Sequence, residues 1–227
     1  MEIIKAAWSQ ERFSFTGKHF VLPPAGIPDR GSTVKDLTLI PRPIAPIDVW
    51  QAVTSPATLD YCARVRHHAV MPARGLEDTT AWWERFGSAA ASNGWELGRG
   101  EARCLALNVH IGRTHEEAVA GARNPHDEWI KFLSPYGRFR SYKMADGSPT
   151  PFDHKPSLED TIEQQQMAIG SITEVTELIE AYRDRLGVEH LVCFFDMPGL
   201  TREQMDEQLT LMATEVAPRL GVTMGAA

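Results

Sequence analysis

Residues 47–59 read IDVWQAVTSPATL, and this stretch decides how the rest of the chain is interpreted. Residues 47–53 are a short apolar run that predicts a β-strand. Ser55 and Pro56 follow, suited to be the N-cap and the first residue of a helix that we expect over residues 57–66. A strand that passes directly into a capped helix is the repeating unit of a parallel α/β sheet.

The same alternation repeats along the sequence. Further strands are expected at residues 68–71, 103–110 and 189–195, the last an apolar run typical of a buried parallel strand. Helices are expected at residues 79–94, from Thr114 toward residue 132 with Glu117 completing a capping box, from Ser157 to 166, at 173–186, and from Thr201 to 220. This order predicts an α/β fold of the (β/α)8 TIM-barrel type. We count about four units where a closed barrel has eight, so the chain is expected to form the C-terminal half of a barrel.

Two irregular segments interrupt this pattern. Residues 22–46 are rich in proline, and residues 134–156 are rich in proline, glycine and aromatic residues. We expect both to be surface excursions, and the second has the character of a functional or mobile loop. Residues 13–20 (FSFTGKHF) predict a hairpin around Thr16 and Gly17. The whole chain, residues 1–227, is expected to form one partial barrel domain.

Charge and cysteine usage narrow the classes of partner. The net charge is −7 and there is no Lys/Arg cluster, which argues against a nucleic-acid partner. No apolar run approaches the roughly 20 residues of a membrane span, and the N-terminus is too polar for a signal peptide. The three cysteines lie far apart, so they predict neither a disulfide framework nor a zinc site. A cytoplasmic protein without a membrane partner is therefore expected.

Two helix N-termini are the best candidates for a binding site. The first helix N-terminus presents the hydroxyls of Ser55 and Thr58, next to Thr54, at the carboxyl end of a strand. The second opens at Gly170 and Ser171, shortly before the last strand. Unpaired N–H groups and the helix dipole attract phosphate at such positions. The alternative is that both serines are ordinary helix caps, which are common.

Other polar residues are weaker candidates. His110 ends a strand on the presumed active face, where it could contact a substrate, and Arg138 together with Arg140 could close over an anion. The alternatives are a packed histidine and a solvated loop, and Trp82 is expected to be a packing residue. No HExxH, GxSxG, P-loop or Cys/His nucleophile pattern is present. The sequence therefore assigns no catalytic residue and no metal ligand.

The order of these segments resembles the luciferase-like flavin-dependent monooxygenases, relatives of bacterial luciferase. No single motif is specific, and the resemblance lies in the order and spacing of six stretches. These are residues 8–20 (WSQERFSFTGKHF), 41–43 (PRP), 47–59, 109–118 (VHIGRTHEEA), 167–175 (MAIGSITEV) and 187–220. The resemblance covers nearly the whole chain but only the second half of the family's barrel.

This resemblance implies a barrel that binds reduced FMN, or a deazaflavin, and uses O2 to oxidise a small organic substrate. It implies that a flavin reductase supplies the cofactor. It places Thr54, Ser55 and Thr58 at the flavin phosphate, and Gly170 and Ser171 near it. Since the family's first strands are missing, it also implies a homo- or hetero-oligomer that completes the site. The alternatives are a flavin-free remnant or interaction protein, and a phosphate-binding barrel enzyme of unrelated chemistry.

Overall fold

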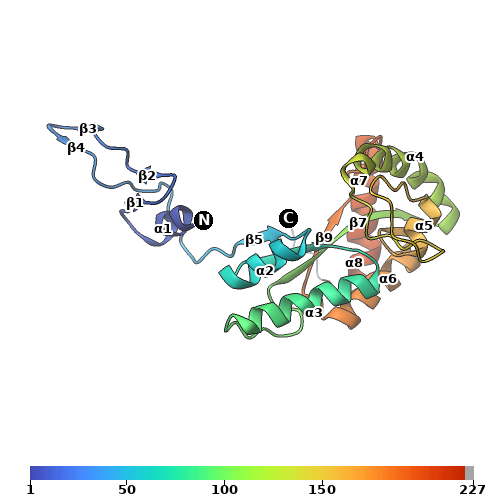
Figure 1. Ribbon diagram of the computed structural model, residues 1–227. Helices are drawn as coiled ribbons and strands as arrows, with labels where there is room; N and C mark the ends of the chain where they lie inside the picture. Colours follow the sequence, from blue (N-terminus) through green and yellow to red (C-terminus); the bar gives the residue numbers. More distant parts are fainter. Residues whose placement is uncertain (223–227) are drawn as a thin grey trace. The chain divides into compact units, whose positions relative to one another are not determined.

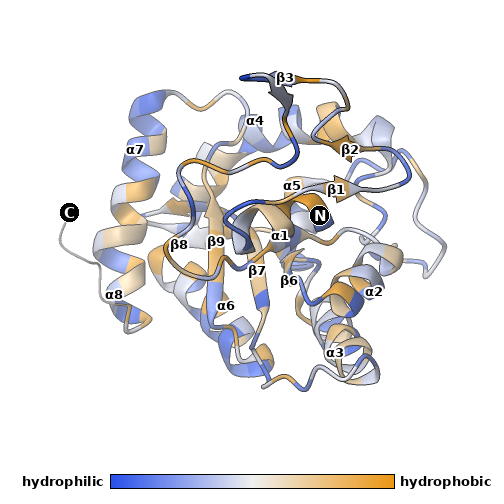
Figure 2. Cartoon of the chain, turned by 90° about the vertical axis from the view of Figure 1, so that its left-hand side faces the viewer, coloured by the Kyte–Doolittle hydropathy of each residue, from blue (hydrophilic) through white to orange (hydrophobic). Residues whose placement is uncertain are grey.

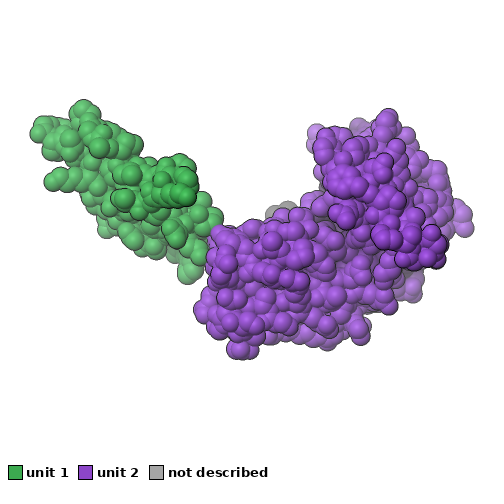
Figure 3. Space-filling view, viewed as in Figure 1, with its two compact units in different colours: residues 1–48 green, residues 49–227 purple. Residues whose placement is uncertain are grey.

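The computed structural model describes residues 1–222, which fall into two compact units, Met1–Asp48 and the chain from Val49 onward (Figure 3). The expectation that residues 1–227 form one domain stays a prediction. Among the described residues, no helix is both long enough and apolar enough to cross a membrane.

The first unit is built from short elements. Helix α1 (Glu2–Ser9) is followed by two antiparallel pairs, β1 (Phe15–Thr16) with β2 (Val21–Leu22), and β3 (Pro28–Asp29) with β4 (Ser32–Thr33). The hairpin expected at residues 13–20 is present, but Thr16 belongs to a strand and the turn spans residues 17–20, closed by Gly17 N–H donating to the Phe20 carbonyl at 2.8 Å. The Pro-rich segment is largely irregular, but it contains the β3–β4 pair, which the sequence did not predict, and Leu37, which forms an isolated antiparallel bridge with Phe13.

The second unit is built on five parallel strands (Figure 1). They are β5 (Trp50–Ala52), β6 (His68–Pro72), β7 (Arg103–Gly112), β8 (Ala168–Ser171) and β9 (His190–Phe194). Strand β7 is central, since it pairs with β6 and β9 along its first half and with β8 along its second. The sequence missed β8, because its four residues are fixed by pairing with β7 rather than by a local pattern. Strand β5 is three residues long instead of the seven expected.

Helices connect and cover these strands. They are α2 (Pro56–Val65), α3 (Leu76–Ser92), α4 (His115–Leu133), the 3₁₀ turn Ser134–Tyr136, α5 (Leu158–Glu163), α6 (Ile172–Leu186), α7 (Arg202–Leu211), the π-helical stretch Met212–Val216 and α8 (Ala217–Arg219). Helix α3 begins before the expected Thr79, because Gly75 is its N-cap and the Thr79 hydroxyl accepts from the Arg74 N–H instead. At α4 the Thr114 cap is confirmed, but Glu117 bonds the N–H of Arg113, so the reciprocal capping-box bond to Thr114 is absent.

The core lies between one face of the sheet and the helices. Leu59, Trp83, Phe86, Leu105 and Tyr182 are buried together there, joining α2, α3, β7 and α6. Figure 2 shows apolar residues concentrated on the strands, whereas much of α7 is polar. Burial of this apolar face is the main stabilising contribution to the unit.

The opposite face of the sheet is partly open. Strand β9 alternates exposed and half-buried residues, with Val192 40% and Phe194 44% exposed. Trp50 is also partly exposed, and its ring contacts His68 and His190 at centroid distances of 4.5 and 4.9 Å. The expectation that residues 189–195 form a buried strand is therefore wrong. Among the described residues, strand β9 pairs only with β7, and its side chains at 190, 192 and 194 are exposed.

Candidate functional site

A cavity of about 390 Å³ lies where strands β5 and β6 end. It brings together Thr54 and Ser55, predicted as phosphate ligands, and Arg138, predicted to contact substrate. The other lining residues are Pro56, Arg74, Trp82, Tyr136, Gly137, Arg140 and Ser141. The excursion at residues 134–156 thus supplies one wall, and the start of α2 supplies another.

The N-terminus of α2 has the expected cap. Ser55 is the N-cap, its Oγ accepts from the Thr58 N–H at 3.2 Å, and Oγ lies 2.8 Å from the Thr58 Oγ1. Pro56 has no N–H, and the Thr58 N–H already donates to Ser55, so the first turn leaves the Ala57 N–H for a ligand. No acidic residue lies in this first turn. The positive end of the helix dipole is therefore not neutralised by its own side chains.

Three guanidinium groups line the same cavity. Arg74 lies over the ring of Trp82, 4.3 Å from its centroid, and its Nη2 donates to the Thr54 carbonyl at 3.3 Å. The buried Nε of Arg74 has no hydrogen-bond partner in the described part of the chain. Burial lowers the pKa of Arg74, the charge of Arg138 lowers it further, and Asp78 raises it. An anion would relieve both the desolvation and the repulsion between these cations.

No carboxylate lines this cavity, and neither Arg138 nor Arg140 has an ion pair with any described residue. Both side chains are exposed, so they can turn toward a bound ligand. An Arg fork donates two parallel hydrogen bonds to a phosphate, and three such forks beside a helix N-terminus make a strongly anion-selective surface.

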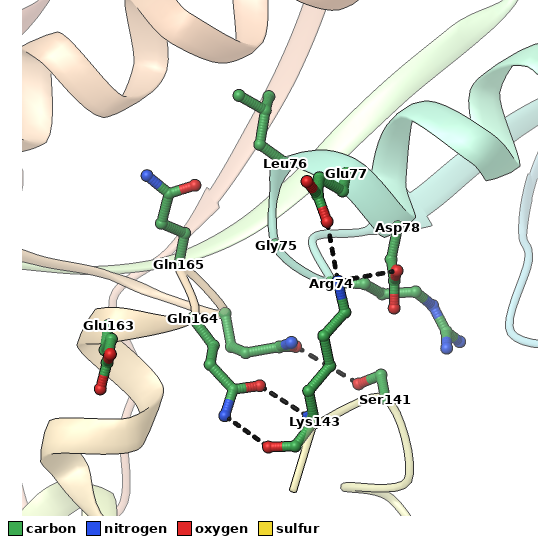
Figure 4. A pocket seen from close by; sticks show the side chains of 11 residues that line it. Arg74, Gly75, Leu76, Glu77, Asp78, Ser141, Lys143, Glu163, Gln164 and Gln165 are labelled. Atoms are coloured by element: carbon green, nitrogen blue, oxygen red, sulfur yellow. Dashed lines mark hydrogen bonds and ion pairs between the residues drawn. The ribbon is translucent and has the colours of Figure 1, made fainter. Parts of the chain in front are cut away.

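A second cavity of about 370 Å³ lies on the other side of Arg74 (Figure 4). It shares Arg74 and Ser141 with the first, and it is otherwise lined by Gly75, Leu76, Glu77, Asp78, Lys143 and residues 163–166. Lys143 reaches from the excursion to the first turn of α3, where its Nζ lies 2.9 Å from Glu77 Oε2. Here Lys143 is paired with Glu77 and Asp78, and Glu163 adds a further negative charge, so this cavity lacks the unbalanced positive charge of the first.

The turn at Gly170 and Ser171 has a different character. Ser171 caps α6, and Glu174 completes a capping box, its Oε2 accepting from the Ser171 N–H at 2.7 Å. A Cβ placed on Gly170 would lie 2.9 Å from that same oxygen, so the space beside Gly170 is filled by the Glu174 side chain. The structure does not bring Gly170 and Ser171 into the cavity of Ser55, and their contact with a phosphate stays a prediction.

His110 also lies apart from the arginines. Strand β7 continues to Gly112, so His110 does not end the strand as expected. Its ring lies against Gly121 of α4 in a cavity of about 160 Å³ that α7 closes with Gln204 and Glu207. Burial lowers the pKa of the imidazole, whereas Glu207 raises it. Its contact with a substrate stays a prediction. Within residues 1–222, no three His, Cys, Asp or Glu side chains are grouped to hold a metal ion.

Arg74 is the site residue that sequence reasoning missed, and Trp82, expected only to pack, supports it. The available signal was position, since Arg74 follows strand β6 almost at once, as Ser55 follows β5. Carboxyl ends of neighbouring parallel strands meet at one edge of a sheet, which is where α/β folds place their ligands.

The sequence matches a known protein family. A model of the luciferase-like monooxygenases matches residues 1–190. The chain belongs to that family. The resemblance drawn from the order of its segments is thereby confirmed. No curated protein matches the sequence significantly.

Solved structures support the barrel-type fold. The monooxygenase RslO1 from Streptomyces bottropensis is 14% identical, with a TM-score of 0.69 over 96% of this chain and 59% of its own. The oxygenating constituent of 3,6-diketocamphane monooxygenase from Pseudomonas putida, a type II Baeyer–Villiger monooxygenase solved with FMN, is 19% identical, with a TM-score of 0.69 over 99% and 62%. An F420-dependent secondary alcohol dehydrogenase, solved with an F420–acetone adduct, is 13% identical, with a TM-score of 0.58 over 90% and 56%.

At these identities the likeness shows the fold alone, and it confirms the predicted TIM-barrel type. The chain spans less than two thirds of the length of these structures. The open sheet of five parallel strands agrees with a partial barrel.

Proposed function

We propose that this chain binds the phosphate of a flavin in the cavity lined by Thr54, Ser55, Arg74, Arg138 and Arg140, with the Thr58 hydroxyl 2.8 Å from that of Ser55. One observation carries the proposal: three guanidinium groups meet the uncompensated N-terminus of α2 in a cavity without a carboxylate. A phosphate monoester carries close to two negative charges at neutral pH, which suits this excess of positive charge. The residues present therefore fit the group that the family membership implies.

FMN is the flavin we propose, with a deazaflavin as the alternative. Both kinds of cofactor occur among the structural neighbours, FMN in one and F420 in another. A reduced flavin, delivered by a flavin reductase in the cytoplasm, would supply the two electrons that reduce one atom of O2 to water while the other atom is transferred to a small organic substrate. This chain's own residues would hold and orient the phosphate of the flavin. The groups that do so are the Ala57 N–H, the hydroxyls of Ser55 and Thr58, and the three arginines.

We further propose that the site is completed by another polypeptide, either a second copy or a different chain. Among residues 49–222, strand β5 pairs only with β6, and strand β9 only with β7, so each leaves one strand edge without a partner in that range. Val192 and Phe194 expose apolar surface beside the edge of β9. Free edges and apolar faces of this kind favour association.

The experiment is a titration of the purified protein with oxidised FMN and, under anaerobic conditions, with reduced FMN. We expect saturable binding with a Kd in the micromolar range, because charge-assisted hydrogen bonds dominate the contact. A flavin-free remnant protein, the alternative, would bind neither form at high micromolar concentration, alone or with added flavin reductase, and this result would overturn the proposal. Detection of a sugar phosphate in preference to FMN would instead support a barrel enzyme of unrelated chemistry.

A further inference from the structure

The excursion that carries Arg138 and Arg140 contacts the rest of the unit through Lys143, a few residues further along the chain. Lys143 Nζ lies 2.9 Å from Glu77 Oε2 and 3.7 Å from Asp78 Oδ1, both in the first turn of α3 (Figure 4). This ion pair joins residues 66 positions apart in the sequence. It therefore fixes where the excursion crosses the start of α3.

The backbone of Lys143 is held as well. Its N–H donates to Gln164 Oε1 at 2.7 Å, and its carbonyl accepts from Gln164 Nε2 at 3.0 Å, so one side chain satisfies both groups as a neighbouring strand would. The Ser141 hydroxyl donates to Gln166 Oε1 at 3.3 Å. The turn that supplies these glutamines packs so tightly on Gly75 that a Cβ there would lie 2.6 Å from the Gln164 carbonyl oxygen. The turn that holds Lys143 therefore cannot shift without disturbing the start of α3.

The arginines of the excursion need such an anchor. Arg138 lies close enough to Arg74 to lower its pKa, and neither Arg138 nor Arg140 has a hydrogen bond or ion pair with a described residue that would hold it there. Like charges repel, so the excursion left to itself would move these groups apart. Lys143 also occupies the carboxylates of Glu77 and Asp78, which line the neighbouring cavity and carry charge opposite to that of the arginines.

We propose that Lys143 and Gln164 are positioning residues for the anion cavity. Their contacts, which we call the clasp, hold the excursion in place. Arg138 and Arg140 then lie beside Arg74 and the N-terminus of α2. The proposal rests on the anion site described above. Neither residue lines that cavity, so each would act on affinity only through the arginines. Tyr142, between them in the sequence, is buried and bonds Thr161 at 2.9 Å, so its replacement would disturb packing and is unsuitable as a test.

The test combines binding of inorganic phosphate, measured by calorimetry, with hydrogen exchange of the amides at residues 137–143. Lys143→Met is expected to weaken phosphate binding about two- to fivefold, the range for a solvent-exposed ion pair. Gln164→Ala removes two hydrogen bonds and is expected to weaken it about five- to tenfold. Both variants should speed exchange at residues 137–143 and leave exchange in β6 and β7 unchanged. Lys143→Arg should restore the affinity.

Two other residues provide matched controls. Among the described residues, Lys131 has an ion pair only with Glu128 on the surface of α4, and the Glu163 side chain, next to Gln164 in the sequence, has no hydrogen bond or ion pair. Lys131→Met and Glu163→Ala should change neither quantity. Unchanged exchange at residues 137–143 in both Lys143→Met and Gln164→Ala would show that these residues do not hold the excursion. Faster exchange with unaltered phosphate affinity would show that holding the excursion does not position the arginines. Either result would overturn the proposal. If the unaltered protein binds no phosphate, the anion site itself fails, while the exchange measurement still decides whether the clasp exists.

Discussion

The helices that begin after Ser55 and after Ser171 start in the same way and differ in what their first turns face. Each follows a parallel strand, and each has a serine N-cap whose hydroxyl accepts from the N–H three residues on. At that third position α2 has Thr58 and α6 has Glu174. The side chain there decides whether the helix N-terminus stays open to an external anion.

At Ser171 the helix supplies its own anion. Glu174 Oε2 accepts from the Ser171 N–H, and Oε1 lies 3.0 Å from His115 Nδ1. At Ser55 there is no acid in the first turn, and the charges that arrive from elsewhere are the guanidinium groups of Arg74 and the excursion. A shared local motif thus gives a self-neutralised helix start in one place and a candidate anion site in the other.

Removing the distant cations should produce the largest effect. We expect the double substitution Arg138→Ala and Arg140→Ala to weaken FMN binding about 150-fold or more, since each of the two lost charge-assisted hydrogen bonds contributes at least about 1.5 kcal/mol. Isothermal calorimetry of FMN and of inorganic phosphate would measure it. Arg123, which pairs with Glu159 on the surface, provides the control, because Arg123→Ala leaves the cavity intact. Wild-type affinity in the double variant would show that the arginines do not bind the ligand.

Converting one turn into the other should have the next largest effect. Thr58→Glu places a carboxylate where α6 has Glu174, and that carboxylate would reach back to the Ser55 N–H. We expect FMN binding to weaken about tenfold or more because a fixed negative charge then competes with the phosphate. Thr58→Gln is the matched control, since its amide can cap the helix without the charge. Equal affinities for the two variants would mean that the charge at this position does not matter.

The sequence carried enough local information to predict the Ser55 turn. The apolar run, the N-cap and Pro56 all lie within a few residues, and the cap is confirmed. The sequence also contains the Ser171-Ile172-Thr173-Glu174 spacing of a capping box, a readable signal that weakens the case for phosphate at Ser171. The same spacing predicts a capping box at Thr114. There the structure has the bond from the Glu117 N–H to the Thr114 hydroxyl, but the Glu117 carboxylate accepts from Arg113 and not from Thr114.

What the sequence could not predict depends on contacts between distant segments. The role of Arg74 follows from its nearness to Thr54 and Arg138, which are 20 and 64 positions away along the chain. Strand β8 exists because Ala168 and its neighbours pair with Val109 and those that follow it. The exposure of Val192 and Phe194 depends on which segments pack against β9, and an apolar pattern alone does not register this.

The reciprocal change at α6 should have the smallest effect, and it concerns stability rather than binding. Hydrogen bonding from the Ser171 backbone, ahead of its other contacts, lowers the pKa of Glu174 below its ordinary value. A carboxyl group with a lowered folded-state pKa contributes stability above its unfolded pKa, and that contribution is lost as the pH falls through the folded value. Since Glu174 is 47% exposed, we expect Glu174→Gln to cost under about 1 kcal/mol at pH 7. Chemical unfolding at pH 7 and near pH 3 would measure it. The difference between variant and wild type should shrink in acid, while phosphate binding at the Ser55 turn stays unchanged; a loss of phosphate affinity would show that Ser171 shares the site.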